Sequence, residues 1–267
     1  MILFKDDNMN DDRSRLPVAV MDSGIGGISV LKEIVKLMPH EDCIFFGDSA
    51  NAPYGTKELS QIQQIVMDRA QYLYSKGIKA LVVACNTATS AAIRLLRDRY
   101  RDIPVIGIEP ALKPAVSGDE RHTVVVMATP MTIREKKFQS LMAKYADEGT
   151  VYPLPCPGLA DLIEDGNTQG EKLEKYILEL LMPYLDEHID YIVLGCTHYP
   201  FARQTIQKVA GDSVRIIDGS LGTARQLQRR LKATGLENKQ SRKGNIIFED
   251  SIPEKIQLCR QMFEAEI

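Results

Sequence analysis

Two stretches of sequence decide the fold of this chain: LVVACNTAT at residues 81–89 and YIVLGCTHYP at residues 191–200. Each begins with a short apolar, β-branched run and continues into small polar residues, which predicts a buried parallel strand that opens into a loop. In open α/β sheets, ligand sites form beyond the carboxyl ends of the strands. Cys85 and Cys196 therefore stand where reactive groups stand. A lone buried cysteine is usually inert, but two in matching positions favour proton transfer on two faces of one carbon.

The pattern around these cysteines belongs to a longer repeat. We expect strands at residues 18–21, 43–46, 81–84 and 105–108, and a second series at residues 123–128, 150–152, 191–194 and 214–217. Helical stretches fall between them, at residues 27–37, 59–76, 89–100, 132–145, 168–185 and 201–209. Alternating strands and helices predict an α/β protein with a doubly wound parallel sheet, here formed twice as two pseudo-symmetric domains. The active site is expected in the cleft between the domains.

The segment after residue 217 is too short to form a domain of its own. It contains an expected helix at 221–233, a strand at 245–249 and a helix at 253–265. We predict that it packs on the first half, so that the first domain comprises residues 1–109 and 219–267. The second domain, residues 110–218, is then a continuous insertion. Residues 1–16 are interpreted as a flexible extension.

Composition indicates a soluble enzyme. The 267 residues carry a formal net charge of −3, which gives no electrostatic reason to expect nucleic acid or an acidic membrane surface as a partner. No apolar stretch approaches the roughly 20 residues that a membrane span needs. The acidic N-terminal segment is the opposite of a signal peptide. The five cysteines lack the spacing of a disulfide framework, which favours a reducing cytoplasm; Cys43, Cys156 and Cys259 are interpreted as packing residues. The oligomeric state stays open, a homodimer included.

A glycine-rich loop follows the first expected strand. Its sequence is DSGIGG at residues 22–27, and a helix comes next. Backbone N–H groups of such a loop can bind an anion at the start of the helix. The dinucleotide pattern G-x-G-x-x-G fails, because Ser29 takes the third glycine position. A carboxylate is therefore the favoured anion. Asp22 either caps the helix or orients the Cys85 thiol.

Other loops at the same edge supply polar groups. Asp48 and the turn Pro53-Tyr54-Gly55 follow the second strand. Thr129 and Thr132 stand at the start of a helix, where capping is at least as strongly indicated as ligand binding. Glu164 is either a solvated acid at a helix end or a member of the site. His198, two residues past Cys196, is the favoured general acid/base partner.

Four motifs together resemble those of the glutamate racemases. They are DSGIGG at 22–27, PYG at 53–55, ACNTA at 84–88 and GCTHYP at 195–200, in register from about residue 17 onward. The resemblance implies a cofactor-independent interconversion of L- and D-glutamate, which supplies D-glutamate for bacterial peptidoglycan. Related aspartate racemases also use two cysteines, but their second motif usually carries an acid at the position of His198.

The resemblance also implies a role for each matching residue. The thiol of Cys196 takes the α-proton from L-glutamate, and the thiol of Cys85 takes it from D-glutamate. Asp22 and His198 assist these bases, and Asp48 and Glu164 are further carboxylates of the site. The implied substrate contacts are Asp22, Ser23, Tyr54, Gly55, Asn86, Thr87, Thr197 and His198, to which our reading of the loops adds Thr129 and Thr132.

Thiols suit this chemistry, because their ordinary pKa of about 8.5 makes both thiol and thiolate accessible near neutral pH. Two other classes remain as alternatives. Cys85, Cys196 and His198 could form a three-ligand zinc site, or the chain could be a binding module without activity. The intact thiols argue against the second alternative. We expect no metal and no pyridoxal cofactor, since no lysine stands in a recognisable pyridoxal setting.

Overall fold

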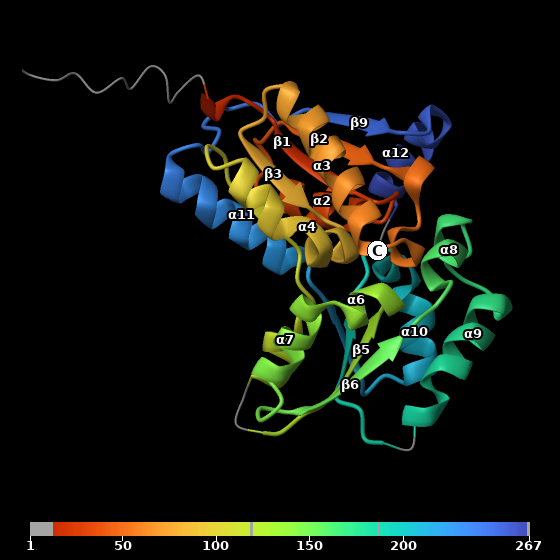
Figure 1. Cartoon of the computed structure of the whole chain (residues 1–267). Helices are drawn as coiled ribbons and strands as arrows, with labels where there is room; N and C mark the ends of the chain where they lie inside the picture. Colours follow the sequence, from red (N-terminus) through yellow and green to blue (C-terminus); the bar gives the residue numbers. More distant parts are fainter. Residues whose placement is uncertain (1–12, 118–119, 186, 266–267) are drawn as a thin grey trace, which may run out of the picture.

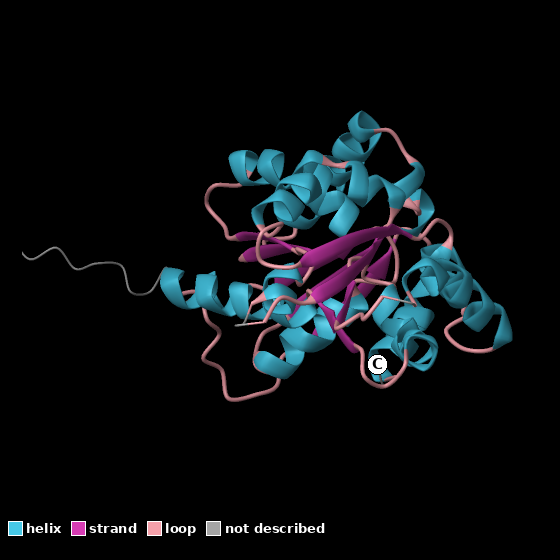
Figure 2. Ribbon diagram, turned by 90° about the horizontal axis from the view of Figure 1, so that it is seen from below, coloured by secondary structure: helices cyan, strands magenta, loops and turns pink. Residues whose placement is uncertain are grey.

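The computed structural model describes residues 13–117, 120–185 and 187–265. Within these ranges the strands form two parallel sheets, one of five strands and one of four. Each sheet, together with the helices packed on it, is called a lobe below; Figure 1 shows the first lobe above the second. In Figure 2 the strands form a layer with helices on both sides. The predicted α/β class with two parallel sheets is confirmed.

The first sheet has the strand order β4-β3-β1-β2-β9. Its strands are β1 (Val18–Asp22), β2 (Cys43–Gly47), β3 (Ala80–Val83), β4 (Val105–Gly107) and β9 (Ile246–Asp250). The helices of this lobe are α2 (Ile28–Leu37), α3 (Leu59–Ser75), α4 (Asn86–Arg99), α11 (Ser220–Thr234) and α12 (Ile256–Glu264), with short 3-10 turns η1 (Ser49–Asn51), η2 (Tyr54–Thr56) and η5 (Pro253–Lys255). Val18 and Val20 of β1 pack toward α2, α11 and α12, whereas Ala19 and Met21 pack toward α3 and α4. Such burial on both faces is typical of a parallel sheet.

The second sheet has the order β6-β5-β7-β8. Its strands are β5 (Thr123–Ala128), β6 (Thr150–Pro155), β7 (Tyr191–Leu194) and β8 (Arg215–Asp218). The helices of this lobe are α5 (Leu112–Val116), α6 (Pro130–Arg134), α7 (Lys136–Lys144), α8 (Leu159–Glu164), α9 (Glu171–Leu181) and α10 (Arg203–Ala210), with 3-10 turns η3 (Met182–Tyr184) and η4 (Tyr199–Ala202). This order repeats β2-β1-β3-β4 of the first sheet. Strands β3 and β7 are thus equivalent, and Cys85 and Cys196 follow them.

Among the boundaries that differ from the predicted ones, three can be traced to particular residues. Helix α4 begins at Asn86, earlier than expected, because Cys85 itself is its N-cap and accepts a hydrogen bond from the backbone of Ala88. Strand β6 continues to Pro155, since it lies at the edge of the sheet, where a proline need not donate to a neighbour. The helix expected at 132–145 is divided into α6 and α7 by the extended backbone of Glu135.

The C-terminal segment returns to the first lobe. Strand β9 pairs with β2 along its whole length, and α11 and α12 share a core with α2. The turn η5 lies between β9 and α12, and it reaches the edge of the sheet at which Cys85 stands. This placement brings the last part of the chain close to the cleft between the lobes.

The start of the chain differs in part from the predicted flexible extension of residues 1–16. Residues 1–12 lie outside the described residues, but residues 13–16 are held against the first lobe. Ser14 is buried, and its carbonyl accepts a hydrogen bond from the ammonium of Lys79. Lys79 also pairs with Glu41, and both side chains are buried. A buried ammonium needs such partners, so Ser14 is fixed where Lys79 requires it.

Candidate active site

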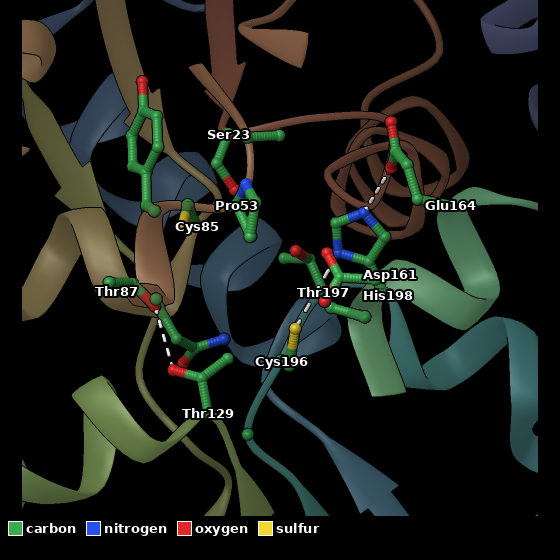
Figure 3. A pocket seen from close by; sticks show the side chains of 16 residues that line it. Ser23, Pro53, Cys85, Thr87, Thr129, Asp161, Glu164, Cys196, Thr197 and His198 are labelled. Carbon is green, nitrogen blue, oxygen red and sulfur yellow. Dashed lines mark hydrogen bonds and ion pairs between the residues drawn. The ribbon is translucent and has the colours of Figure 1, made fainter. Parts of the chain in front are cut away.

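A cavity lies between the two lobes, at the carboxyl ends of the strands. It has a volume of about 450 Å³ when its open mouth is included, and it is lined by Ser23, Ala52, Pro53, Tyr54, Gly55, Cys85, Asn86, Thr87, Thr129, Ala160, Asp161, Glu164, Gly195, Cys196, Thr197 and His198. Of the predicted site residues, eleven are in this set; Asp22, Asp48 and Thr132 are not. Figure 3 shows both thiols in this cavity, one contributed by each lobe.

Cys85 occupies the first-lobe wall of the cavity. As the N-cap of α4, its Sγ lies 3.4 Å from the backbone nitrogen of Ala88. The side chain is almost fully buried. Burial, and then the charge of Asp22, raise the pKa of Cys85 to about 12, although hydrogen bonds from Ser23 and Ala88 act in the opposite direction. These surroundings favour the protonated thiol.

Cys196 occupies the second-lobe wall and has a different partner. Its Sγ lies 3.8 Å from Nδ1 of His198, and Nε2 of the same imidazole lies 2.6 Å from Oε2 of Glu164 (Figure 3). Burial acts to lower the pKa of His198, but the hydrogen bonds and charges of Cys196 and Glu164 outweigh it and raise the pKa well above its usual value. These contacts favour the imidazolium form, whose positive charge then lies beside the Cys196 sulfur.

Glu164 ends helix α8 and completes this row of groups. Burial acts to raise its pKa, but hydrogen bonds and charges from His198 and Lys255 outweigh burial and lower the pKa to about 2. Its Oε1 lies 2.5 Å from Nζ of Lys255, and its Oε2 also accepts a hydrogen bond of 3.4 Å from the backbone nitrogen of Ile25. Of the two alternatives left open by the sequence, the structure shows Glu164 at the site rather than in solvent.

The glycine-rich loop brings the first lobe close to the second. A Cβ atom on Gly26 would lie 2.5 Å from Nδ1 of His198 and 2.7 Å from Oγ1 of Thr197. Glycine is thus required here by a close approach between lobes. Two N–H groups of the loop donate to protein carboxylates, Gly24 to Asp22 and Ile25 to Glu164. In this structure the anion at the loop is therefore the protein's own.

Asp22 is buried at the end of β1, beneath the wall of the cavity. Its Oδ1 accepts a hydrogen bond of 3.1 Å from the Thr197 hydroxyl, and its Oδ2 accepts one of 3.2 Å from Gly24. Burial is the main cause of its raised pKa, with the charge of His198 and these hydrogen bonds acting to lower it. Asp22 does not cap α2, whose N-cap is Gly27 and has no side-chain cap. Asp22 thus links the glycine-rich loop of the first lobe, through Gly24, to Thr197 in the Cys-Thr-His stretch of the second lobe.

Tyr54 and Asp48 form a second buried pair. The Tyr54 hydroxyl donates a 2.7 Å hydrogen bond to Oδ2 of Asp48, which is fully buried and also accepts from Asn51. Arg69 lies 3.4 Å from the other Asp48 oxygen. What Tyr54 can contribute to the cavity is therefore its ring, because its hydroxyl donates to Asp48. Asp48 does not line the cavity itself but bonds to Tyr54, which does.

A cluster of threonine hydroxyls joins the lobes on the Cys85 side. Thr87 Oγ1 lies 3.2 Å from that of Thr129 and 3.1 Å from that of Thr132. Thr129 also caps α6 by accepting from the backbone of Thr132, so capping and cavity lining coincide in one residue. Thr132 itself is buried behind the wall. Asn86 lines the cavity, and its buried Oδ1 has no hydrogen-bond partner among the described residues.

Sequence reasoning missed Lys255, Asp161 and the wall residues Ala52, Pro53, Ala160 and Gly195. Lys255 lies in η5, far along the chain from every motif, and only the return of the C-terminal segment brings it to Glu164. Asp161 stands one helical turn before Glu164 on α8, so the helical spacing of the two acids was the available signal.

The alternative zinc site finds no support in the geometry. Among the residues that the structure describes, no group of three or more His, Cys, Asp or Glu side chains is arranged to hold a metal ion. Cys43, Cys156 and Cys259 are buried and unbridged, and all three belong to hydrophobic cores. No helix within the described ranges is long and apolar enough to span a membrane.

Comparison with known proteins gives the family. The family model for Asp/Glu/hydantoin racemases matches residues 18–227. A glutamate racemase of Clostridium perfringens is 47% identical over 260 residues, which are 97% of this chain and 100% of that protein. The chain belongs to the glutamate racemase family. Its enzyme class is therefore that of a racemase, an isomerase.

Solved structures of glutamate racemases share the fold of this family member. The enzyme of Francisella tularensis in complex with D-glutamate superimposes with a TM-score of 0.83 at 34% identity and covers 95% of both chains. The Escherichia coli enzyme, in complex with L-glutamate and an activator, gives a TM-score of 0.81 at 28% identity over 93% of this chain and 95% of that one. The predicted family and the predicted enzyme class are confirmed.

Proposed function

We propose that this protein racemises glutamate without a cofactor, using Cys85 and Cys196 as two bases. The observation that carries the proposal is the pair of buried thiols that follow equivalent strands and line one cavity from opposite lobes. Their surroundings differ in the way that the reaction needs. An imidazolium accompanies Cys196, whereas burial and a carboxylate keep Cys85 protonated.

In the direction from L-glutamate, the Cys196 thiolate takes the α-proton. The C–H electron pair remains on the α-carbon and is delocalised into the adjacent carboxylate, and the Cys85 thiol then donates its proton to the opposite face of that carbon. The enzyme is left with a Cys196 thiol and a Cys85 thiolate, the state that reacts with D-glutamate. His198 stabilises the thiolate form of Cys196, and the two titrations are coupled.

Apart from His198, the donors that the cavity offers to the carbanion are neutral. None of the described residues that line it is a lysine or an arginine. We assign the binding of the substrate carboxylates to the hydroxyl groups of Ser23 and Thr87, the Asn86 amide, Thr197 and backbone N–H groups of the cavity wall. Donors that are fixed in a water-poor site stabilise developing negative charge more strongly than water does, so neither a metal nor pyridoxal is required.

Glutamate is the proposed substrate because relatives that share 47% and 34% of their residues with this chain carry that activity in their names. The complexes of such enzymes with D- and with L-glutamate support a small-molecule substrate of either hand. We further propose that the D-glutamate serves cytoplasmic peptidoglycan synthesis. We propose that residues 1–109 and 219–267 form the first domain and residues 110–218 the second. A homodimer is the candidate assembly.

The decisive experiment is an assay of both enantiomers of glutamate and aspartate with no added cofactor. We expect glutamate to be racemised in both directions, and activity to survive extended chelation. Faster turnover of aspartate than of glutamate would overturn the substrate. Loss of activity on chelation, with recovery on adding zinc, would overturn cofactor independence.

A further inference from the structure

Lys255 is a cation of the first lobe that bonds to an acid of the second. Its Nζ lies 2.5 Å from Oε1 of Glu164, and both side chains are largely shielded, with 27% and 13% of their areas exposed. The other oxygen of the same carboxylate holds His198. Glu164 therefore has a separate partner on each oxygen, and rotation of its carboxylate would break both bonds.

The segment that carries Lys255 is held in place by the strand before it. Asp250 accepts hydrogen bonds from the Ile252 backbone and from the Ser49 hydroxyl, both at 2.8 Å. Ser251 donates its backbone N–H to Gly47 at 2.9 Å, and its hydroxyl oxygen accepts from Ala50 at 2.8 Å. The backbone of Lys255 in turn donates to Ile252. The ammonium is thus presented to Glu164 from a fixed turn.

We propose that Lys255 is a positioning residue for the Cys196 half of the reaction: it fixes the Glu164 carboxylate across the cleft, and Glu164 holds His198 against Cys196. This inference rests on the proposed function. The base of a catalytic pair is commonly oriented by a further group. Here Glu164 orients His198, and Lys255 in turn orients Glu164. Because Lys255 and Glu164 belong to different lobes, the same bond also holds the two walls of the cavity together on the Cys196 side.

Loss of the ammonium acts on Cys196 in one direction. It releases Oε1 of Glu164, which loosens the imidazolium beside the sulfur, and it removes a positive charge from the row Lys255–Glu164–His198–Cys196. Both changes disfavour the thiolate of Cys196. Other titratable groups also interact with this row: Asp250 and Cys259 near Lys255, Asp22 near His198, and Cys85, Cys156 and Tyr199 near Cys196. Cys85 lies in the other half of the site, where Thr87 rather than Lys255 makes the contact between lobes.

The test compares Lys255→Met, which keeps the length of the side chain, with Lys255→Arg, which keeps the charge. Lys208→Met is the matched control, since it removes an exposed pair with Glu174 in the second lobe. We expect Lys255→Met to lower kcat for both enantiomers by about 10- to 100-fold, the range for a displaced catalytic group, with a smaller change in KM. Lys255→Arg should recover most of the loss, and Lys208→Met should behave as wild type.

Two further readouts separate positioning from a general structural role. In a Glu164→Gln background, Lys255→Met should have little additional effect, because the two residues act as one unit. With α-deuterated substrates, Lys255→Met should increase the isotope effect for L-glutamate more than that for D-glutamate, since Cys196 abstracts only from the L-enantiomer. Full activity in Lys255→Met, or an equal loss in both backgrounds, would overturn the inference.

Alkylation of the thiols by iodoacetamide tests the same inference without relying on activity. With each modified cysteine identified by peptide mass, Lys255→Met should slow the alkylation of Cys196 by about fivefold or more, because less of it is thiolate. Cys85 is the internal reference and should keep its rate. If wild-type enzyme failed to racemise glutamate, the proposed function would fall and this measurement would decide on Lys255 alone. Equal rates for Cys196 in wild type and Lys255→Met would reject its role.

Discussion

The two halves of the site occupy equivalent positions in a repeated fold and are chemically unlike. Cys85 follows β3 and caps a helix, and no basic side chain of the described residues is hydrogen-bonded to it. Cys196 follows β7, precedes a 3-10 turn and stands beside an imidazolium that is held by a carboxylate. The four strands of the second sheet repeat the order of four strands in the first, so the difference arises from the residues after each strand rather than from the fold.

This difference teaches how one repeat supplies two protonation states. The proposed two-base reaction needs one thiolate and one thiol at the same time, and two identical surroundings would give each thiol the same affinity for protons. In the first lobe, burial and Asp22 favour the thiol. In the second, the positive charge favoured on His198 lies beside the Cys196 sulfur. The repeated fold therefore places the two groups, and the loops distinguish them.

Removal of either thiol is the strongest test of the comparison. Cys85→Ala and Cys196→Ala should each lower racemisation in both directions by at least the ~10²–10⁴ that one positioned acid or base supplies. Both directions suffer because the reverse reaction uses the same pair in opposite protonation states. The measurement is the rate from each enantiomer, and circular dichroism confirms folding.

Deuterium oxide sharpens this first test. Wild-type enzyme that starts from L-glutamate and is stopped early should label the D-product while the remaining L-substrate stays largely unlabelled, since different thiols take and return the proton. Label in both pools would indicate a single shared base. Full activity in either alanine variant would return that cysteine to the inert class and end the two-base mechanism.

The sequence could predict those parts of the molecule that depend on local pattern. The β-branched runs at residues 123–128 and 191–194 coincide with β5 and β7, because a strand that is buried on both faces needs apolar side chains throughout. The two cysteines could be placed for the same reason, since each follows such a run directly.

Features that depend on distant contacts could not be predicted. Nothing near Lys255 signals its partner, because Glu164 lies in another lobe. Gly26 suggested an anion site, yet the close approach of His198 is what requires a glycine. In each case the second group comes from a different part of the fold.

The second prediction concerns Glu164, which gives the Cys196 half its own dependence on pH. Its pKa is about 2 in the folded protein against an ordinary value of 4.5. The unfolded chain therefore binds more protons between these values, and the stabilisation is present above pH 4.5 and lost as the pH falls toward 2. The shift corresponds to a contribution of about 3 kcal/mol to the free energy of unfolding.

Urea unfolding of wild type and Glu164→Gln across this range measures the effect. Wild type should lose about 3 kcal/mol more than the variant between pH 5 and pH 2, because the amide cannot titrate. Glu174→Gln, which alters an exposed pair, is the control. Its free energy of unfolding should change with pH by the same slope as that of wild type, since exposed pairs contribute little. Identical slopes in wild type and Glu164→Gln would remove the electrostatic contrast between the two halves.

The smallest expected effect concerns Cys156, a thiol that, like Cys196, lies just after the carboxyl end of a strand in the second sheet. It follows β6, and it is buried with its Sγ 3.4 Å from the Leu154 carbonyl oxygen. Burial raises its pKa, and it does not line the cavity. Position at the carboxyl ends of the strands is thus common to both thiols, whereas of the two only Cys196 has an imidazolium partner.

Cys156→Ala should lower the free energy of unfolding by about 1 kcal/mol, as for a small buried apolar group, and should keep racemisation within about twofold of wild type. Urea unfolding and the two-direction assay measure these outcomes, with Cys196→Ala as the matched variant in the same lobe. A loss of activity in Cys156→Ala as deep as in Cys196→Ala, with stability unchanged, would mean that position at the sheet edge, and not the partner of the thiol, selects the catalytic cysteine.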